Sequence, residues 1–246
     1  MRYLILSDIH ANWEALSAVV ARAGSSYDQI VCCGDVVGYG ADPDAVVQWV
    51  RENVSGIVRG NHDKACAGLE DLEWFNPVAR ASAVWTQAII QPEHAEYLRG
   101  LAQGPERING FQILHGSPLD EDEYVTSEQD VAQVAPYLDC SVSFFGHTHL
   151  QGAFLCHRNG VKRLMQSELH GTDEEIALEQ DVNYLINPGS VGQPRDGDRR
   201  AGYAIYDSAQ HLVTLCRTEY DVSSAQKKIL DAGLPELLAL RLDSGL

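Results

Sequence analysis

The sequence lacks any apolar run of about 18 residues, the length that a membrane-spanning helix needs. Its N-terminus also lacks the basic stretch, long apolar core and cleavage site of a secretory signal. We therefore expect a cytoplasmic protein with no membrane partner. The six cysteines are scattered, without Cys-x-x-Cys spacing, so all six are expected to be reduced thiols in the core.

Clusters of lysine and arginine are absent too, and the formal net charge is -17. Binding to nucleic acid irrespective of its sequence depends on cationic contacts to phosphate, so nucleic acid is a disfavoured partner. An anionic substrate would need a local positive charge, which metal ions could supply. Internal repeats and low-complexity tracts are also missing, and 45% of the residues are hydrophobic. We therefore expect residues 1–246 to form a single domain with a sizeable core.

Short apolar runs that end in His, Asp or Asn beside Gly recur five times along the chain. The segments that follow these runs are Asp8-Ile9-His10, Gly34-Asp35, Gly60-Asn61-His62-Asp63, His115-Gly116 and Gly146-His147-Thr148-His149. The length and composition of the runs predict β-strands, each ending in a tight polar loop. Strand ends of a parallel or mixed sheet converge on one crevice where ligands bind, so we expect these polar groups to lie together.

Helical patterns separate the first three strands. Asn12 is expected to cap one helix that ends before Gly24, and Asp42-Pro43 to open another that extends to about residue 53. The resulting strand-helix-strand-helix-strand order predicts parallel strands with helices on the faces of the sheet.

A helical insert is expected at about residues 70–105, with one helix capped by Asn76 and another starting at Pro92. Its aromatic side chains Trp74, Phe75 and Trp85 either pack in the core or form a wall of the substrate cleft. Further helices are expected at residues 127–137 and, near the end of the chain, at about 222–243. The last third otherwise predicts strands at residues 153–156, 184–187, 202–206 and 212–217, a turn at 158–160 and an acidic loop at 168–181.

The strand ends carry seven oxygen or imidazole groups that could bind a metal, and no thiolate. They are Asp8, His10, Asp35, Asn61, His115, His147 and His149. Residues two apart in an extended segment point to the same side, so Asp8 and His10 can face one pocket, and the same alternation applies to the last two histidines. Seven groups suffice for two divalent ions that share a ligand, and Asp35 is expected to be the bridge because a carboxylate has two oxygens. Such a pair of ions suits in-line displacement at phosphorus.

Taken in order, the motifs Asp-x-His, Gly-Asp, Gly-Asn-His-Asp, His and Gly-His-Thr-His resemble those of the calcineurin-like metallophosphoesterase superfamily, in particular its small bacterial phosphodiesterase-like branch. The resemblance covers positions 8–149. It implies an α/β fold in which two mixed β-sheets pack as a sandwich flanked by helices, in four layers. It also implies a metal-dependent phosphoesterase in which a hydroxide bound to two divalent ions attacks phosphorus, with diesters slightly favoured over monoesters.

The same resemblance assigns roles by position. The ligands of one ion would be Asp8, His10, Asp35 and His149, and those of the other Asp35, Asn61, His115 and His147. His62 is implied as the proton donor to the leaving group or as a contact to the transition state, with Asp63 orienting it. The ions stay open among Mn, Fe, Zn and Mg, because all of these suit nitrogen and oxygen ligands.

One departure separates the chain from the Ser/Thr protein phosphatases and the symmetrical dinucleoside tetraphosphatases. Their second motif continues Asp-Arg-Gly, with the arginine on phosphate, whereas here Val36 follows Asp35. A protein phosphatase is therefore disfavoured, and a small phosphorylated substrate is expected. Arg195, in a loop rich in Gly and Pro, either replaces that cation or is a solvated loop residue. Together with Asn61, it is the candidate contact to substrate.

Several alternatives remain open: a phosphomonoesterase, a dinucleoside polyphosphate hydrolase, a nuclease and a non-catalytic scaffold on the same fold. The charge disfavours the nuclease. A scaffold is expected to have lost His62 or some of the ligands, and this chain keeps them all. The remaining histidines lie on helix or loop sequence without partners and are expected at the surface; they are His94, His157, His170 and His211.

Overall fold

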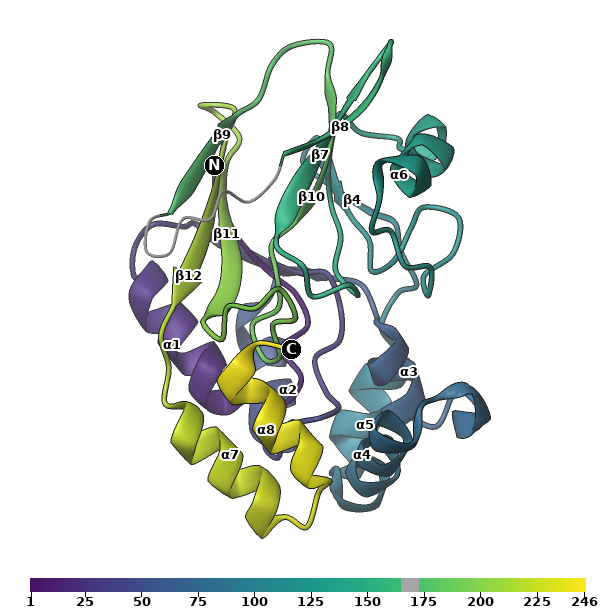
Figure 1. Ribbon diagram of the computed structural model, residues 1–246, viewed down its shortest axis with the longest axis vertical. Coiled ribbons are helices and arrows are strands. Elements are labelled where there is room, and N and C mark those ends of the chain that lie inside the picture. Colours follow the sequence, from purple (N-terminus) through teal and green to yellow (C-terminus); the bar gives the residue numbers. More distant parts are fainter. Residues whose placement is uncertain (165–172) are drawn as a thin grey trace.

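The computed structural model describes residues 1–164 and 173–246. Within these ranges the strands form two mixed six-stranded sheets that pack face to face, with helices flanking them (Figure 1). In spatial order, the first sheet contains β3 (Gly56–Ile57), β2 (Gln29–Cys32), β1 (Arg2–Leu6), β11 (Ala201–Asp207), β12 (Leu212–Thr218) and β9 (Glu174–Ala177). The second contains β4 (Glu106–Ile108), β5 (Phe111–Ile113), β6 (Val142–Phe144), β10 (Asn183–Asn187), β7 (Gly152–His157) and β8 (Gly160–Leu164). The predicted sandwich of two mixed sheets is confirmed.

Strand β1 shows why the layers stack in this way. Leu4 and Leu6 belong to the apolar cluster between the first sheet and its helices, whereas Tyr3 and Ile5 belong to the cluster between the two sheets. Tyr3 meets Phe111 of the second sheet edge to face, with ring centroids 4.8 Å apart. A strand that is apolar on both faces is stable only when both faces are covered, so β1 lies inside its sheet, parallel to β2 and antiparallel to β11.

Helices cover the outer face of each sheet. The first sheet packs against α1 (Trp13–Ala23) and α2 (Pro43–Asn53), which connect the parallel strands β1, β2 and β3 as predicted. Asn12 caps α1 by accepting a hydrogen bond from the backbone N–H of Ala15. Asp42 precedes α2 without capping it, because its carboxylate binds Lys228 instead. On the second sheet, α6 (Glu128–Val134) packs through Val131 and Val134.

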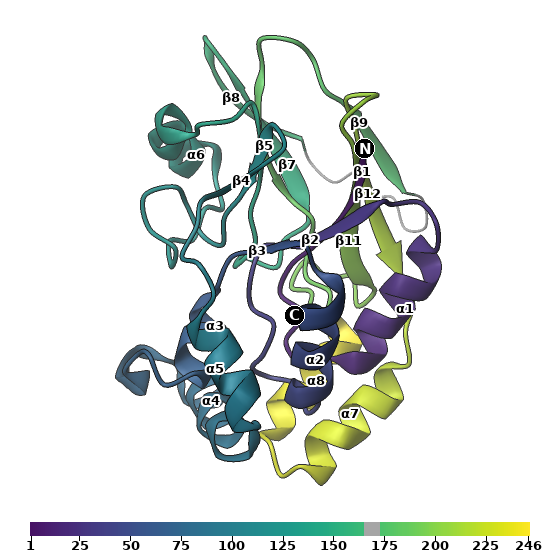
Figure 2. The ribbon, with the colours of Figure 1, turned by 180° about the vertical axis from the view of Figure 1, so that it is seen from behind.

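The remaining helices lie together at one end of the sandwich, as Figure 2 shows from behind. They are α3 (Asn61–Cys66), the 3-10 turn η1 (Leu72–Trp74), α4 (Pro77–Ile89), α5 (Pro92–Arg99), α7 (Val222–Asp231) and α8 (Glu236–Ser244). The 3-10 turn η2 (Ala135–Tyr137) continues α6. The predicted starts of α4 and α5 are confirmed, and the break between α7 and α8 contains Gly233, whose φ is +70°.

Three elements differ from the sequence expectation. The segment 61–63, expected to be a loop, begins α3, because Gly60 ends the preceding extended backbone and Asp63 accepts a hydrogen bond from its N–H. Part of the expected acidic loop is strand β9, which pairs with β12 and buries Ile176, whereas residues 165–172 lie outside the described residues. Strand β8 pairs with β7 across the predicted turn. Its adjacent Lys162 and Arg163 interrupt the apolar pattern of a strand, but charged residues are typical of an edge strand.

Some single-residue expectations are also corrected. His94 is 3% exposed rather than at the surface, because its ring bonds to Asp44 and Gln48 of α2. His157 and His211 are exposed as expected, and His170 lies outside the described residues. All six cysteines are free, but two of them are only partly buried, Cys140 and Cys156. Among the described residues, no helix is long and apolar enough to cross a membrane.

Candidate functional site

The polar segments at the strand ends are joined to one another through their backbones. The N–H of Asp8, after β1, donates to the carbonyl of Gly34, after β2, at 3.0 Å. The N–H of His10 donates in turn to the carbonyl of Asp35 at 3.0 Å, and Gly146, after β6, donates to His115 at 2.9 Å. These bonds join the loops in two pairs, and the N–H of His147 links the pairs by donating to Oδ1 of Asp8 at 3.1 Å, so the loops form one connected floor where the strands end.

All seven side chains that the sequence singled out as metal-capable meet on this floor. The first group contains Asp8, His10, Asp35 and His149, and the second Asp35, His115 and His147; within each group the candidate ligand atoms all lie within 4.8 Å of one another. These residues are buried, and Asp35 belongs to both groups. Asn61 adjoins the second group, with its Oδ1 3.2 Å from His115 Nε2.

Backbone carbonyls fix the orientation of the four imidazoles. Nδ1 of His10 contacts the carbonyl of Val37 at 3.0 Å, and Nδ1 of His115 contacts that of Cys33 at 2.8 Å. His149 uses Nδ1 in the same way toward Gln193, whereas His147 uses Nε2 toward Asp122. A carbonyl only accepts hydrogen bonds, so each of these nitrogens carries a proton, and the other nitrogen is the one that can offer a lone pair to a metal. This arrangement is typical of metal-binding histidines.

The first group passes a direct test of fit for a cation. Nε2 of His10 and Nε2 of His149 lie 3.0 Å apart, and both have lone pairs because their Nδ1 atoms donate to carbonyls. Two lone pairs at this distance repel unless a positive charge lies between them. Metal–nitrogen bonds of ~2.0–2.1 Å place two ligand nitrogens roughly 3.0–3.4 Å apart. Together with the carboxylates, these nitrogens suit a divalent metal ion.

The shared residue Asp35 uses its two oxygens differently from the expectation. Its Oδ1 accepts a hydrogen bond from the backbone N–H of His62 at 2.8 Å. Its Oδ2 is the oxygen that faces both groups, 3.7 Å from His10 Nε2 and 3.5 Å from His115 Nε2. The expectation that Asp35 offers one oxygen to each side is thus corrected to a single oxygen between them. A Cβ at Gly60 would lie 2.0 Å from Oδ1, so only glycine fits there.

The backbone of the site is not extended, contrary to the argument from strand alternation. Asp8, His10, Asp35, His147 and His149 all have positive φ values, between 50° and 67°. Left-handed backbone is uncommon for residues other than glycine and concentrates at functional sites. It turns the side chains of His147 and His149 into different groups, although the two residues are only two positions apart.

Burial and mutual charge set the protonation of these groups. Burial by itself would raise the pKa of Asp35, but the adjacent His115 and His62 bring it well below its usual range. Burial opposes the charged form of His115 as well, yet Asp35 raises the pKa of His115 to about 10. Burial lowers the pKa values of His10 and His149. Asp35 and His115 therefore form a charged pair, and a divalent cation competes with the imidazolium proton for the same lone pair.

His62 lies beside both groups and is held by packing. Its ring is 4.3 Å from that of Tyr39 and meets Phe75 edge to face at 5.4 Å. A Cβ at Gly38, whose φ is +87°, would lie 2.5 Å from Nδ1 of His62. Burial lowers the pKa of His62 to about 4, and Nδ1 has no hydrogen-bond partner among the described residues.

The structure corrects the expected contact between Asp63 and His62. Oδ1 of Asp63 accepts hydrogen bonds from the N–H groups of Val36 and Val37, at 2.8 and 3.2 Å, and Oδ2 accepts from Gly60 at 3.0 Å. Burial raises the pKa of Asp63 to about 7 against these hydrogen bonds. Asp63 therefore ties the loop after β2 to the start of α3 and supports His62 only through the backbone.

Comparison with known proteins agrees with this geometry. A family model described as the calcineurin-like phosphoesterase superfamily domain matches residues 1–211. The chain belongs to the calcineurin-like phosphoesterase superfamily. An uncharacterized protein of Methanocaldococcus jannaschii is 36% identical over 247 residues, which cover 98% of this chain and 97% of the relative. Membership in this superfamily supports a hydrolase that acts on phosphoester bonds.

Two solved structures resemble this phosphoesterase along its whole length. The crystal structure of a metallophosphoesterase from Sphaerobacter thermophilus is 38% identical, covers 100% of this chain and 99% of its own, and has a TM-score of 0.86. A hypothetical protein from Pyrococcus horikoshii OT3 is 19% identical, covers 100% and 98% of the two chains, and has a TM-score of 0.77. The second of these shows the fold alone.

Arg195 of this phosphoesterase is not a solvated loop residue. Its side chain is half-buried, and Nη2 donates a hydrogen bond to the hydroxyl of Tyr39 at 3.1 Å. The guanidinium also lies 5.7 Å from the centroid of the Tyr39 ring. Its charge helps to lower the pKa values of His10, His62 and His149, after the larger effect of burial in each case. A cation thus lies beside the first group.

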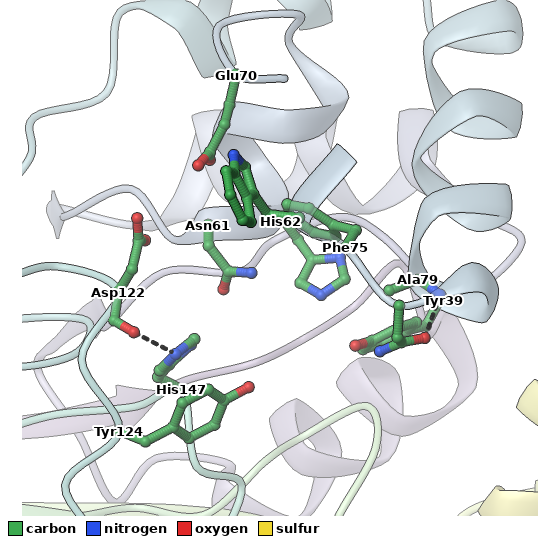
Figure 3. A pocket seen from close by; sticks show the side chains of 11 residues that line it. Tyr39, Asn61, His62, Glu70, Phe75, Ala79, Asp122, Tyr124 and His147 are labelled. Carbon is green, nitrogen blue, oxygen red and sulfur yellow. Dashed lines mark hydrogen bonds between the residues drawn. The ribbon is translucent and has the colours of Figure 1, made fainter. Parts of the chain in front are cut away.

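A pocket opens outward from the second group (Figure 3). Its cavity of ≈ 230 Å³ is lined by Asn61, His62 and His147 on the inner side and by aromatic and acidic side chains farther out. The loop that carries Asp122 and Tyr124 forms one wall, and the Tyr124 ring lies 3.9 Å from that of His147. An organic group attached to a phosphate beside the histidines would enter this pocket.

Sequence reasoning missed several residues of the site. Tyr39 lies between two glycines, and its left-handed φ of 62° places its ring against His10 and His62. Tyr124 and Asp122 lie in a segment without apolar periodicity, and no sequence signal places them beside His147. Of the aromatic residues noted in the helical segment, Phe75 and Trp74 line the pocket, whereas Trp85 packs against an apolar cluster.

Proposed function

We propose that this chain is a dinuclear metal-dependent phosphoesterase that favours phosphodiesters over monoesters. The observation that carries the proposal is the position of Asp35, whose Oδ2 lies between two buried groups of histidine and aspartate. One ion is proposed on Asp8, His10, Asp35 and His149, and the other on Asp35, Asn61, His115 and His147. When bound, such ions polarise a phosphoryl oxygen and lower the pKa of water.

The other residues of the site are proposed to handle the substrate. Asn61 and Arg195 bind the phosphoryl oxygens, because an amide and a guanidinium both donate hydrogen bonds to such oxygens. His62 either protonates the departing oxygen or donates a hydrogen bond to a phosphoryl oxygen, and its Nδ1, which has no hydrogen-bond partner among the described residues, is available for either role. Asp63 keeps the loop after β2 in register with α3.

The substrate is proposed to be a small phosphorylated molecule in the cytoplasm. Two observations support this: the pocket beside the metal groups holds about one ring system, and the net charge of -17 disfavours nucleic acid. The absence of an arginine directly after Asp35 supports diesters and other small esters over phosphoproteins. Phosphomonoesters and dinucleoside polyphosphates are the alternative substrates, and a scaffold without turnover is the alternative function.

A substrate panel with added Mn²⁺ tests the proposal. The panel contains bis-p-nitrophenyl phosphate, p-nitrophenyl phosphate, cyclic nucleotides, dinucleoside polyphosphates and a phosphopeptide, and kcat/KM is measured for each. We expect the diesters to be hydrolysed best and the phosphopeptide poorly. Efficient phosphopeptide turnover with diesters untouched would overturn the ranking. Stoichiometric metal without turnover of any ester would favour the scaffold.

A further inference from the structure

Aromatic side chains surround the mouth of the pocket beside the second metal group. Tyr39, Phe75, Trp74 and Tyr124 all line it. Trp74 is 90% exposed and Tyr124 is 55% exposed, although both are large rings. Exposed apolar surface that gathers in one place usually marks a binding site, whereas a single exposed ring needs no explanation.

The exposed position of Trp74 is imposed by its neighbours. Leu72 and Phe75, on either side, pack against the core between the first sheet and its helices. The turn between them is closed by a hydrogen bond from the N–H of Phe75 to the carbonyl of Leu72 at 3.2 Å, and Asp71 caps its start. The fold thus holds the turn in place and presents Trp74 to the pocket, without using its ring for packing.

The inner rings connect this mouth to the reacting centre. Tyr124 lies against His147, and Phe75 and Tyr39 lie against His62, with centroid distances of 3.9 to 5.4 Å. A phosphate placed at the two histidines would therefore direct its organic substituent between Tyr124 on one side and Phe75 on the other, toward Trp74. The lining would then meet the substituent largely with ring faces and edges.

The charged carboxylate or ammonium-type side chains that line the pocket are all acidic. Its charged lining residues are Glu70 and Asp122, and among the described residues no lysine or arginine lines it. Nearby Lys64 is shared by three carboxylates: its Nζ lies 3.5 Å from Glu70, 3.1 Å from Glu121 and 2.6 Å from Asp122. Oδ1 of Asp122 is buried without a hydrogen-bond partner among the described residues, and Oε2 of Glu70 has the Lys64 ammonium as an ion-pair partner but accepts no hydrogen bond there. Such oxygens repel anions and accept hydrogen bonds from N–H groups.

We propose that this pocket selects esters whose organic group is a planar aromatic ring system without negative charge, such as a nucleobase or a phenyl ring. Trp74 and Tyr124 form the stacking surface, and Glu70 with Asp122 excludes carboxylates and further phosphates. The cavity of ≈ 230 Å³ has room for a ring system beside the metal groups. The inference rests on the proposed function for the phosphate end of the substrate.

Binding of phosphonates, which cannot be hydrolysed at the P–C bond, tests the inference without turnover. Phenyl-, cyclohexyl- and methylphosphonate are titrated into the Mn²⁺-loaded chain by isothermal titration calorimetry. Stacking of a base on an aromatic side chain is worth roughly 1–3 kcal/mol, so we expect phenylphosphonate to bind about 10-fold more tightly than cyclohexylphosphonate. Trp74→Ala should remove most of that advantage. Tyr137→Ala, which removes a 57% exposed ring outside the site, should leave it unchanged.

Two further binding comparisons test whether the pocket rejects a negatively charged organic group and which kind of aromatic ring it prefers. 4-Carboxyphenylphosphonate should bind several-fold more weakly than phenylphosphonate, and Glu70→Gln should narrow that gap. Adenosine 5′-phosphate is compared with ribose 5-phosphate in the catalytically impaired His62→Asn variant. An advantage for the adenosine ester that Trp74→Ala abolishes identifies the ring as a nucleobase; no advantage, with phenyl still preferred over cyclohexyl, identifies a smaller aryl group.

The results that would contradict the inference about the pocket can be told apart from those that would contradict the proposed function. Equal affinities for phenyl- and cyclohexylphosphonate would overturn the selection of aromatic groups. So would a phenyl preference that survives Trp74→Ala together with Tyr124→Ala. If methylphosphonate binds while the larger phosphonates gain nothing, the phosphate site stands and the pocket inference fails. If none of the three binds to the metal-loaded chain, both the inference and the proposed phosphate site are wrong.

Discussion

The inner and outer halves of the site are built on opposite plans. In the inner half, the imidazoles and carboxylates are buried, five of the metal-capable residues have left-handed backbone, and carbonyls fix the four imidazoles of the two groups. In the outer half, Trp74 and Tyr124 are exposed where they line the pocket, although Tyr124 also lies against His147. The inner half is therefore organised before any substrate arrives, whereas the outer half gains its contacts only when a ligand fills it.

This difference separates transition-state stabilisation, expected from the inner half, from substrate binding energy, expected from the outer half. Groups fixed in advance stabilise a transition state without reorganising, so damage to the inner half should reduce kcat for every substrate. Exposed rings that only bind an organic group act alike on ground and transition states, so damage to the outer half should raise KM for some substrates alone.

The largest effect is expected for Asp35→Ala. Because Oδ2 of Asp35 lies between both groups, its removal should take away most of both ions, measured by elemental analysis. Activity should fall by more than the ~10–100-fold that loss of a supporting residue costs at a metal site. Asp139→Ala is the control, since this carboxylate forms an exposed ion pair with Arg107.

Full occupancy of both sites in Asp35→Ala would remove the bridging role. It would also contradict the view that the inner half is preorganised around Asp35, because both ions would then bind without the residue that the two groups share. Retention of one ion would show that the groups are independent and that only one of them needs Asp35.

The next effect is expected for His62→Asn, at the border of the two halves. The variant should keep its metals and its fold, since the N–H of residue 62 still binds Asp35. General acid catalysis contributes about 10²–10⁴-fold and matters most for a poor leaving group. We therefore expect a loss of roughly 10²-fold in kcat on an alkyl ester and less on a p-nitrophenyl ester, measured with metal content in the same samples.

Equal losses on the two esters, with metals intact, would assign His62 to the phosphoryl oxygens instead of the leaving group. Loss of metal in this variant would make His62 a ligand, in conflict with the two groups described above. In either case, His62 would have to be counted with the preorganised groups of the inner half and not with the residues at its border with the pocket.

The sequence predicts the inner half far better than the outer half, for physical reasons. Asp8, Asp35 and His115 follow apolar strands directly, so chain connectivity alone brings them to one edge. The left-handed backbone that aims His147 and His149 into different groups carries no such signal, because non-glycine residues reveal it only in three dimensions.

Contacts between distant segments account for the remaining errors. Asp63 was expected to orient the side chain of its neighbour His62. Its carboxylate instead accepts hydrogen bonds from the backbone N–H groups of Val36 and Val37. His94 is buried by Asp44 of another helix, which no local pattern reveals. Tyr124 reaches His147 from an irregular loop, where neither helical nor strand periodicity exists.

A smaller effect is expected for Arg195→Lys. This variant keeps the positive charge but loses the planar guanidinium, whose paired N–H groups can donate two hydrogen bonds to one phosphate. A hydrogen bond to a charged group contributes about 1.5–3 kcal/mol, and lysine recovers part of it as a point charge. KM for a small diester should therefore rise about 10-fold, with kcat nearly unchanged. Steady-state kinetics check this; a fall in kcat at constant KM would mean that Arg195 acts in the transition state and belongs to the inner half.

The smallest effect is expected for Tyr39→Phe. The ring, which packs against His10 and His62, is kept, and only the hydroxyl that accepts from Arg195 is lost. The hydroxyl acts on the substrate only through Arg195, so only part of the about 1.5–3 kcal/mol of a hydrogen bond to a charged group should reach substrate binding, and KM should rise about 2–5-fold at constant kcat and metal content. Residues in one hydrogen-bonded pair are not additive, so in an Arg195→Lys background the same change should have almost no effect. If the increase in KM persists there at full size, the hydroxyl contacts the substrate directly, and the boundary between the preorganised half and the binding half lies at Tyr39 itself.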